Sequence, residues 1–273
     1  MSDEWRTDYV AVPGLKIHTY RSGGDKPPVV LSHGFTDNGL CWTPLARELA
    51  KDFDVIMYDT RGHGLSDSPT AEGEIYEHLA ADLAGLVQKL ELDKPRLIGH
   101  SLGAATVAVT AANYPDLVCC AVLEDPPWRP PSKETASQER SAAMQEWRAN
   151  IVAYQSKSPE ELAAICRREH PRWSEDECHP WAASKLQLDL SVFQFFVTPP
   201  KPWQEFVRRI SCPILLVTAD PELGAIITPE IAQEAASIWR DGRVVHLAGA
   251  GHNIRREQFG AYVKQVTEFL VES

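Results

Sequence analysis

The residues with the clearest chemical potential are those of Gly99-His100-Ser101-Leu102-Gly103, in which a serine stands between two glycines. A short apolar stretch precedes this pattern and an alanine-rich helical pattern follows it, so G-x-S-x-G lies where a strand turns into a helix. Such a turn strains the serine backbone and exposes its hydroxyl at a helix N-terminus, where negative charge is favoured. A side chain at either glycine would collide with the neighbouring strand or helix. Ser101 is therefore predicted to be a nucleophile.

Alternating strand and helix patterns surround this turn and must position it. An N-terminal hairpin is expected over 9–20, and a long amphipathic helix over 75–92. Short apolar segments typical of buried strands follow at 29–32, 54–58, 96–98, 118–123, 213–218 and 243–247. Strands that alternate with helices form mostly parallel sheets, which bind ligands at the carboxyl ends of their strands. The sequence thus predicts an α/β fold with a mostly parallel central sheet and helices on both faces.

The pattern changes between residues 127 and 203. This segment is rich in proline and carries five of the eight tryptophans of the chain. It contains no convincing strand, but helical patterns occur over 137–155, 159–169 and 180–190. We therefore expect a core formed by residues 1–126 and 204–273, into which residues 127–203 are inserted as a helical cap.

Composition limits the setting and the partners. The 273 residues are 44% hydrophobic and 24% charged, as in ordinary globular proteins, and the formal net charge of −11 argues against nucleic acids and anionic membranes as partners. No apolar run approaches the ~18 residues of a membrane span, and the N-terminus does not resemble a signal peptide. The six cysteines form no C-x-x-C pair, which favours free thiols. We expect a cytoplasmic monomer or homodimer that acts on a small molecule.

Four motifs occur in an informative order. They are His33-Gly34-Phe35, Asp59-x-Arg61-Gly62-x-Gly64-x-Ser66, the serine motif at 99–103 and Gly251-His252. Together they make the chain resemble the α/β-hydrolase fold superfamily, in the cap-bearing branch that includes epoxide hydrolases, haloalkane dehalogenases, C–C bond hydrolases and many esterases. The resemblance covers nearly the whole chain outside the cap. It implies an α/β-hydrolase fold with a nucleophile, an acid and a histidine in that order.

The resemblance also assigns the partners of the serine. A serine hydroxyl needs a base within hydrogen-bond reach, and His252 has the expected late position in a glycine-flanked loop. The acid that orients the histidine follows the strand over 213–218 in many relatives, where this chain offers Asp220 and Glu222. In a second group, which includes some dehalogenases and the zearalenone lactonases, the acid lies about 24 residues after the nucleophile. That position is Asp125, which we favour, with Asp220 and Glu222 as the alternatives.

Further roles follow from the same resemblance. The backbone N–H groups of Phe35 and Leu102 would form the oxyanion hole, and the side chains of Phe35 and Trp128 would line the substrate pocket. Asp59 and Arg61 match a turn that is structural in the family.

The nature of the nucleophile narrows the reaction. Relatives that open epoxides or remove halides have an aspartate at the position of Ser101, so a serine favours acyl chemistry. We predict a serine hydrolase for a small, mainly apolar ester or lactone. The sequence has no dinucleotide, phosphate-binding or metal-binding motif, and we expect neither cofactor nor metal. The alternatives are a C–C bond hydrolase and a ligand-binding receptor on the same fold.

Overall fold

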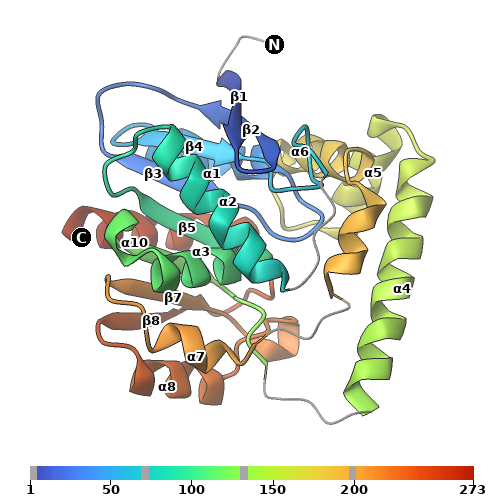
Figure 1. The fold of residues 1–273 in the computed structure, drawn as a ribbon. Helices are drawn as coiled ribbons and strands as arrows, with labels where there is room; N and C mark the ends of the chain where they lie inside the picture. The colour runs from blue at the N-terminus through green and yellow to red at the C-terminus, as the bar shows by residue number, and fades with distance from the viewer. Residues whose placement is uncertain (1–4, 69–73, 130–134, 197–200) are drawn as a thin grey trace.

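A single eight-stranded sheet forms the centre of the protein (Figure 1). The computed structural model describes residues 5–68, 74–129, 135–196 and 201–273. Its strands lie in the order β1-β2-β4-β3-β5-β6-β7-β8. They are β1 (Arg6–Val12), β2 (Leu15–Arg21), β3 (Pro28–Ser32), β4 (Asp54–Tyr58), β5 (Arg96–His100), β6 (Ala121–Glu124), β7 (Ile214–Thr218) and β8 (Gly242–His246).

Strand direction agrees with the sequence pattern. β2 pairs antiparallel with β1, as the predicted N-terminal hairpin requires, and also antiparallel with β4. All pairs from β4 through β3, β5, β6 and β7 to β8 are parallel. The carboxyl ends of these parallel strands therefore meet along one edge of the sheet, which is where the predicted functional residues follow β3, β5, β6 and β8.

Helices cover both faces of the sheet. Alternate strand residues point to opposite faces, so each strand contributes side chains to both helical layers. In β5, for example, Leu97 joins one buried apolar cluster and Ile98 the other. The first cluster includes residues of α2 (Ile75–Lys89), α3 (Leu102–Asn113) and α8 (Pro229–Ile238). The second includes residues of α1 (Thr43–Leu49) and α10 (Phe259–Glu272). The expected α/β architecture with two helical layers is confirmed.

The chain between β6 and β7 forms no strand in its described part and lies beside the sheet (Figure 1). We call residues 127–203 the inserted segment. It holds α4 (Thr135–Gln155), α5 (Pro159–Glu169), α6 (Glu175–Leu186), the 3₁₀ turn η3 (Leu190–Phe196) and the start of α7 (Trp203–Val207). A small apolar cluster joins α5 to α6. α6 begins five residues before the predicted 180, because its acidic first turn favours a helix N-terminus and Pro180 is accommodated inside the helix.

The remaining elements are short. The 3₁₀ turn η1 (Gly39–Trp42) precedes α1, η2 (Pro115–Leu117) precedes β6, η4 (Pro221–Leu223) follows β7, and α9 (Ile254–Glu257) precedes α10. All six cysteines are free, as expected. In the part of the chain that the structure describes, no helix is long and apolar enough to cross a membrane.

Candidate active site

Ser101 occupies the sharp turn between β5 and α3. Its backbone has φ 53° and ψ −116°, a conformation that is costly for a residue with a side chain. The carbonyl of Glu124 on β6 accepts a hydrogen bond from its N–H at 2.9 Å and helps to hold the turn. A Cβ on Gly99 would lie 2.3 Å from the Gly103 carbonyl oxygen, and one on Gly103 only 2.0 Å from that of Ser32. The strained turn and the need for both glycines are as the sequence predicts.

His252 lies in the loop that follows β8 and is partly exposed. The backbone of this loop is tied to the serine turn, since Nε2 of His100 lies 2.9 Å from the carbonyl oxygen of His252. A carbonyl only accepts hydrogen bonds, so His100 donates from Nε2. Burial, together with the nearby His252, lowers the pKa of His100 well below its ordinary value and keeps the ring neutral. His100, the residue before Ser101, thus anchors the loop that carries His252.

Asp125 is the carboxylate that the structure brings to His252. Its Oδ2 lies 2.6 Å from Nδ1 of His252, and its side chain is fully buried. The backbone N–H groups of Ile226 and Ile227 also donate to this carboxylate, at 2.9 to 3.0 Å. These three contacts fix the carboxylate and leave the opposite ring nitrogen of His252 for a proton acceptor role. The backbone of Asp125 has φ 42°, a second strained turn at the end of a strand.

The two alternative acids lie elsewhere. Asp220 contacts His246 at 2.9 Å and accepts a hydrogen bond from the Gly249 N–H at 2.6 Å. Glu222 lies exposed in η4. Neither carboxylate is paired with His252 in the described structure, and Asp220 instead connects the loops that follow β7 and β8. Sequence reasoning assigned no role to His246.

The carboxylate next to Asp125 in sequence, that of Glu124, points to the other face of the sheet, because successive strand side chains alternate in direction. Glu124 is fully buried and accepts a hydrogen bond from the Arg255 N–H at 2.9 Å. Burial raises the pKa of Glu124, while the Arg255 guanidinium, 3.5 Å away, acts in the opposite direction. Glu124 therefore supports the segment after His252 without contacting the imidazole ring.

The loop after β3, residues 33–38, lies against the serine turn, and we call it the oxyanion loop. A Cβ on Gly34 would lie 3.5 Å from Cβ of Ser101 and 2.7 Å from Nδ1 of His100. The absence of a side chain at Gly34 therefore allows this close approach. Phe35 follows directly, and Leu102 is the first residue of α3, whose N–H has no acceptor within the helix. Both predicted oxyanion donors thus belong to segments that adjoin Ser101.

Aromatic side chains pack against Phe35 of the oxyanion loop. The Phe35 ring meets the rings of Trp147 and Phe193 edge to face, with centroids 4.8 and 5.0 Å apart. Trp147 belongs to α4 and Phe193 to η3, so the inserted segment supplies this apolar wall. Trp128 is 2% exposed and stacks on Trp203 at 4.9 Å. Its ring is thus engaged in packing at the junction between the core and the inserted segment.

The Asp59–Arg61 motif forms connections within the core. Arg61 makes a two-pronged ion pair with Asp82 on α2, at 2.6 and 2.7 Å. Asp59 accepts hydrogen bonds from the backbone N–H groups of Gly39 and Leu65 at 2.8 and 2.9 Å. These contacts agree with the structural role that the resemblance implies.

The sequence did not predict the buried ionic cluster that includes Asp37 of the oxyanion loop. It joins Asp37 to Lys185 of α6 and to Arg256, which follows His252 by four residues. One signal for it was present, because Glu177, Trp181 and Lys185 recur every four residues and so share a helix face. Charged residues on the same face as a tryptophan indicate buried ion pairing.

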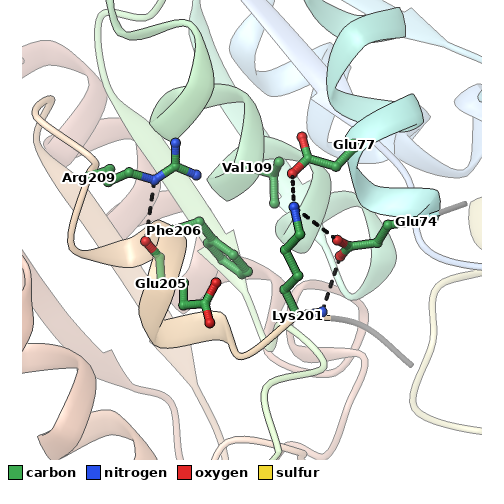
Figure 2. Close-up of a pocket in the computed structure, with 7 residues that line it drawn as sticks. All are labelled: Glu74, Glu77, Val109, Lys201, Glu205, Phe206 and Arg209. Atoms are coloured by element: carbon green, nitrogen blue, oxygen red, sulfur yellow. Dashed lines mark hydrogen bonds and ion pairs between the residues drawn. The ribbon is translucent and has the colours of Figure 1, made fainter. Parts of the chain in front are cut away.

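A cavity of about 300 Å³ lies away from these residues, where α2 and α3 meet α7 (Figure 2). Lys201 extends between Glu74 and Glu77, and its Nζ is 2.9 Å from a carboxylate oxygen of Glu77. The Lys201 ammonium is therefore paired with two glutamates, and Arg209 donates to the backbone carbonyl of Glu205 at 3.3 Å. The described residues hold no group of three or more His, Cys, Asp or Glu that could bind a metal ion.

Comparison with known proteins gives a consistent family match. Residues 29–264 match the model of the alpha/beta hydrolase family. Over 271 residues, covering 96% of this chain and 95% of the relative, the chain is 26% identical to N-formylmaleamate deformylase of Pseudomonas putida. It is 42% identical to 2-(acetamidomethylene)succinate hydrolase of Mesorhizobium japonicum over 105 residues, a match that spans only 37% of that relative's length.

Solved structures extend the match to the fold. The enol-lactonase of Burkholderia xenovorans superposes with a TM-score of 0.74 at 25% identity, covering 97% of this chain and all of that one. The structure of an E-2-(acetamidomethylene)succinate hydrolase superposes with a TM-score of 0.76 at 24% identity, over 97% of this chain and 99% of the other. The fold class predicted from the motifs is confirmed.

Proposed function

The chain belongs to the alpha/beta hydrolase family, and on this premise we propose that it is a serine hydrolase that cleaves a small, mainly apolar carboxylic ester or lactone. The observation that carries the proposal is the 2.6 Å contact between the buried Asp125 and His252, in a loop that His100 ties to the strained turn at Ser101. These are the three residue types that activate a hydroxyl for attack on an acyl carbon.

The proposed reaction has two halves. In the first, Oγ of Ser101 attacks the acyl carbon while Nε2 of His252 takes the hydroxyl proton, and the carbonyl electron pair moves onto oxygen. Backbone N–H groups of Phe35 and Leu102 bind that oxyanion, and its collapse expels the alcohol, which receives the proton from His252. In the second half, water attacks the acyl-enzyme in the same way, releasing the carboxylic acid and restoring Ser101. Asp125 holds His252 in the required tautomer throughout.

The apolar wall supports the choice of substrate. The rings of Phe35, Trp147 and Phe193 pack edge to face with one another. Such an apolar wall gains free energy from contact with an apolar substrate group, whereas a charged group would lose hydration against it. An uncharged acyl or alcohol portion of moderate size fits this chemistry. The similarity to an enol-lactonase over the whole chain supports lactones within the same class.

A second candidate is hydrolysis of a formyl or acyl amide. The deformylase of Pseudomonas putida matches nearly the full length of this chain, and its name denotes removal of a formyl group from nitrogen. The same three residues would act on an amide, with His252 donating its proton to the leaving nitrogen.

Initial rates with a defined substrate panel test the proposal. The panel contains p-nitrophenyl acetate, butyrate and octanoate, a five-membered and a six-membered lactone, an N-formyl amide and a vinylogous diketone for the C–C hydrolase alternative. We expect turnover of uncharged esters or lactones that is lost in Ser101→Ala. Amide turnover above ester turnover would favour the second candidate, and diketone cleavage alone would favour the C–C hydrolase. Binding of an apolar ester without any turnover by the folded wild type would favour a receptor.

A further inference from the structure

The oxyanion loop contains a residue in an unfavourable conformation. The N–H of Asp37 donates to the carbonyl of Gly34 at 3.1 Å and closes a four-residue turn around Phe35 and Thr36. Thr36, the third residue of the turn, has φ 67°. Glycine normally occupies such a position, and a β-branched residue there is a clear outlier. Because Phe35 is the second residue of the same turn, the direction of its N–H depends on this conformation being held.

One side chain of the inserted segment binds this turn directly. Nζ of Lys185 donates to the carbonyl oxygen of Thr36 at 2.8 Å and to its Oγ1 at 3.0 Å, and lies 3.4 Å from Oδ1 of Asp37. An ammonium group has three donors, and these three oxygens match them. Lys185 is 4% exposed, which is rare for a lysine unless it is paired. The contact therefore requires α6 to be seated on the oxyanion loop.

The same cluster extends to the segment after His252. Arg256 donates to Asp37 at 3.1 Å through Nη2 and to Glu177 of α6 at 2.9 Å through Nε. Burial alone would raise the pKa of Asp37, but the cationic Arg256 and Lys185 beside it hold that pKa well below its ordinary value. The ionised Asp37 thus joins three segments of the chain. A neutral contact adds to it, since Asn38 donates to the side chain of Gln187 at 2.8 Å.

We propose that Lys185 is a positioning residue that holds the strained turn at Thr36, and through it the Phe35 N–H, in the geometry of the oxyanion hole. The inference rests on the proposed serine hydrolase function. It gives the inserted segment a part in catalysis, because α6 then supports the donor that stabilises the transition state. Lys185 itself contacts neither substrate nor Ser101.

The variant Lys185→Met removes the three donors and keeps most of the side-chain volume. Loss of one oxyanion donor lowers kcat by about 10²- to 10³-fold, and a displaced donor should lower it by about 10- to 100-fold. We expect this fall in kcat with KM for an uncharged ester changed by less than about threefold, because the donor acts on the transition state. Affinity for phenylboronic acid, which presents a tetrahedral oxyanion, should fall in parallel. Backbone hydrogen exchange of residues 33–38 should become faster.

The matched control is Arg168→Met on α5, which removes one positive charge from an exposed position of the same segment. We expect it to leave kcat, boronic acid affinity and exchange of residues 33–38 at wild-type values. A folded Lys185→Met protein with wild-type kcat and wild-type exchange in this loop would overturn the proposal. Faster exchange without a fall in kcat would overturn it as well, because the loop would then move without affecting catalysis.

A second variant covers the case in which Lys185→Met does not fold. The pair Lys185→Met with Asp37→Asn removes the buried negative charge together with its lysine partner, and the same kcat and exchange criteria apply to it. Failure of the proposed function has a different signature, since wild-type enzyme would then turn over none of the ester, lactone or amide substrates. In that case hydrogen exchange of residues 33–38 still decides whether Lys185 holds the turn.

Discussion

Nδ1 of His252 lies 2.6 Å from Oδ2 of Asp125, a residue 127 positions earlier in the chain. The carboxylate comes from the end of β6, and the loop after β7 contributes the Ile226 and Ile227 N–H groups that bind it. Asp220, which also follows β7, is instead paired with His246. In the proposed mechanism, His252 is thus oriented from β6, the neighbour of the strand β5 that leads into Ser101. The first prediction follows from this choice.

Asp125→Asn should lower kcat by about 10⁴-fold, because an amide no longer selects the histidine tautomer that accepts the serine proton. Steady-state kinetics with the best ester of the panel measures the effect. The matched variant Asp220→Asn should keep kcat within a few-fold of wild type, since its partners are His246 and Gly249. The reverse ranking of the two variants would show that Asp220 is the acid.

Gly34→Ala should impair catalysis more than folding. The added Cβ would lie 2.7 Å from Nδ1 of His100, so the oxyanion loop must shift away from the serine turn. We expect kcat to fall by about 100-fold, comparable to loss of an oxyanion donor. Gly260→Ala in α10 is the control, because its Cβ meets nothing within 4 Å and alanine favours a helix by about 1 kcal/mol. Equal kcat in both variants would contradict a close contact between this loop and Ser101.

Arg61→Met should destabilise the protein without changing its chemistry. Arg61 and Asp82 are both buried, and removal of one partner of a buried ion pair costs about 3–5 kcal/mol. Urea unfolding measures the loss, while kcat per folded enzyme should stay near wild type. For comparison, Lys51→Met breaks an exposed pair with Glu48 and should cost less than about 1 kcal/mol. A large fall in kcat for a stable Arg61 variant would place this residue in the reaction.

Stability should decrease between pH 7.5 and pH 5.5 because of buried neutral histidines. Burial lowers the pKa of His63 from 6.5 to about 3 and also lowers the pKa values of His33 and His100. Below pH 6.5 the unfolded chain binds protons that the folded protein cannot, so the free energy of unfolding falls as the pH decreases. His63 should contribute about 1.4 kcal/mol over this interval, and His33 and His100 should add to the loss in the same direction.

Urea titrations at the two pH values test this dependence. His63→Gln should lose about 1.4 kcal/mol of the difference, because glutamine does not titrate. The exposed His179 provides the control, and His179→Gln should retain the full difference. Equal unfolding free energies of the wild type at both pH values would contradict neutral burial of these rings.

Local chemistry made much of the fold and part of the site predictable. Short apolar segments indicated the parallel strands. The two glycines around Ser101 indicated a turn that only glycine can flank, as the 2.0 and 2.3 Å approaches confirm. These features depend on neighbours in sequence, which a pattern records directly.

The features that the sequence did not predict depend on contacts between residues far apart in the chain. Lys185 and Asp37 are separated by 148 positions, and only the seating of α6 on the oxyanion loop brings them together. The strain at Thr36 was equally hidden, because threonine is a residue that normally avoids a positive φ. Trp128 stays a predicted pocket residue, and its stacking on Trp203 depends on how the inserted segment begins and ends.

Covalent capture of the nucleophile tests the central claim most directly. The wild-type protein is treated with a fluorophosphonate, and mass spectrometry locates the phosphonyl group. We expect one adduct per chain on the peptide that contains Ser101, with no adduct in Ser101→Ala and much slower labelling in His252→Ala. A folded wild-type protein that gains no adduct, or gains it at another residue, would contradict Ser101 as the nucleophile of a serine hydrolase.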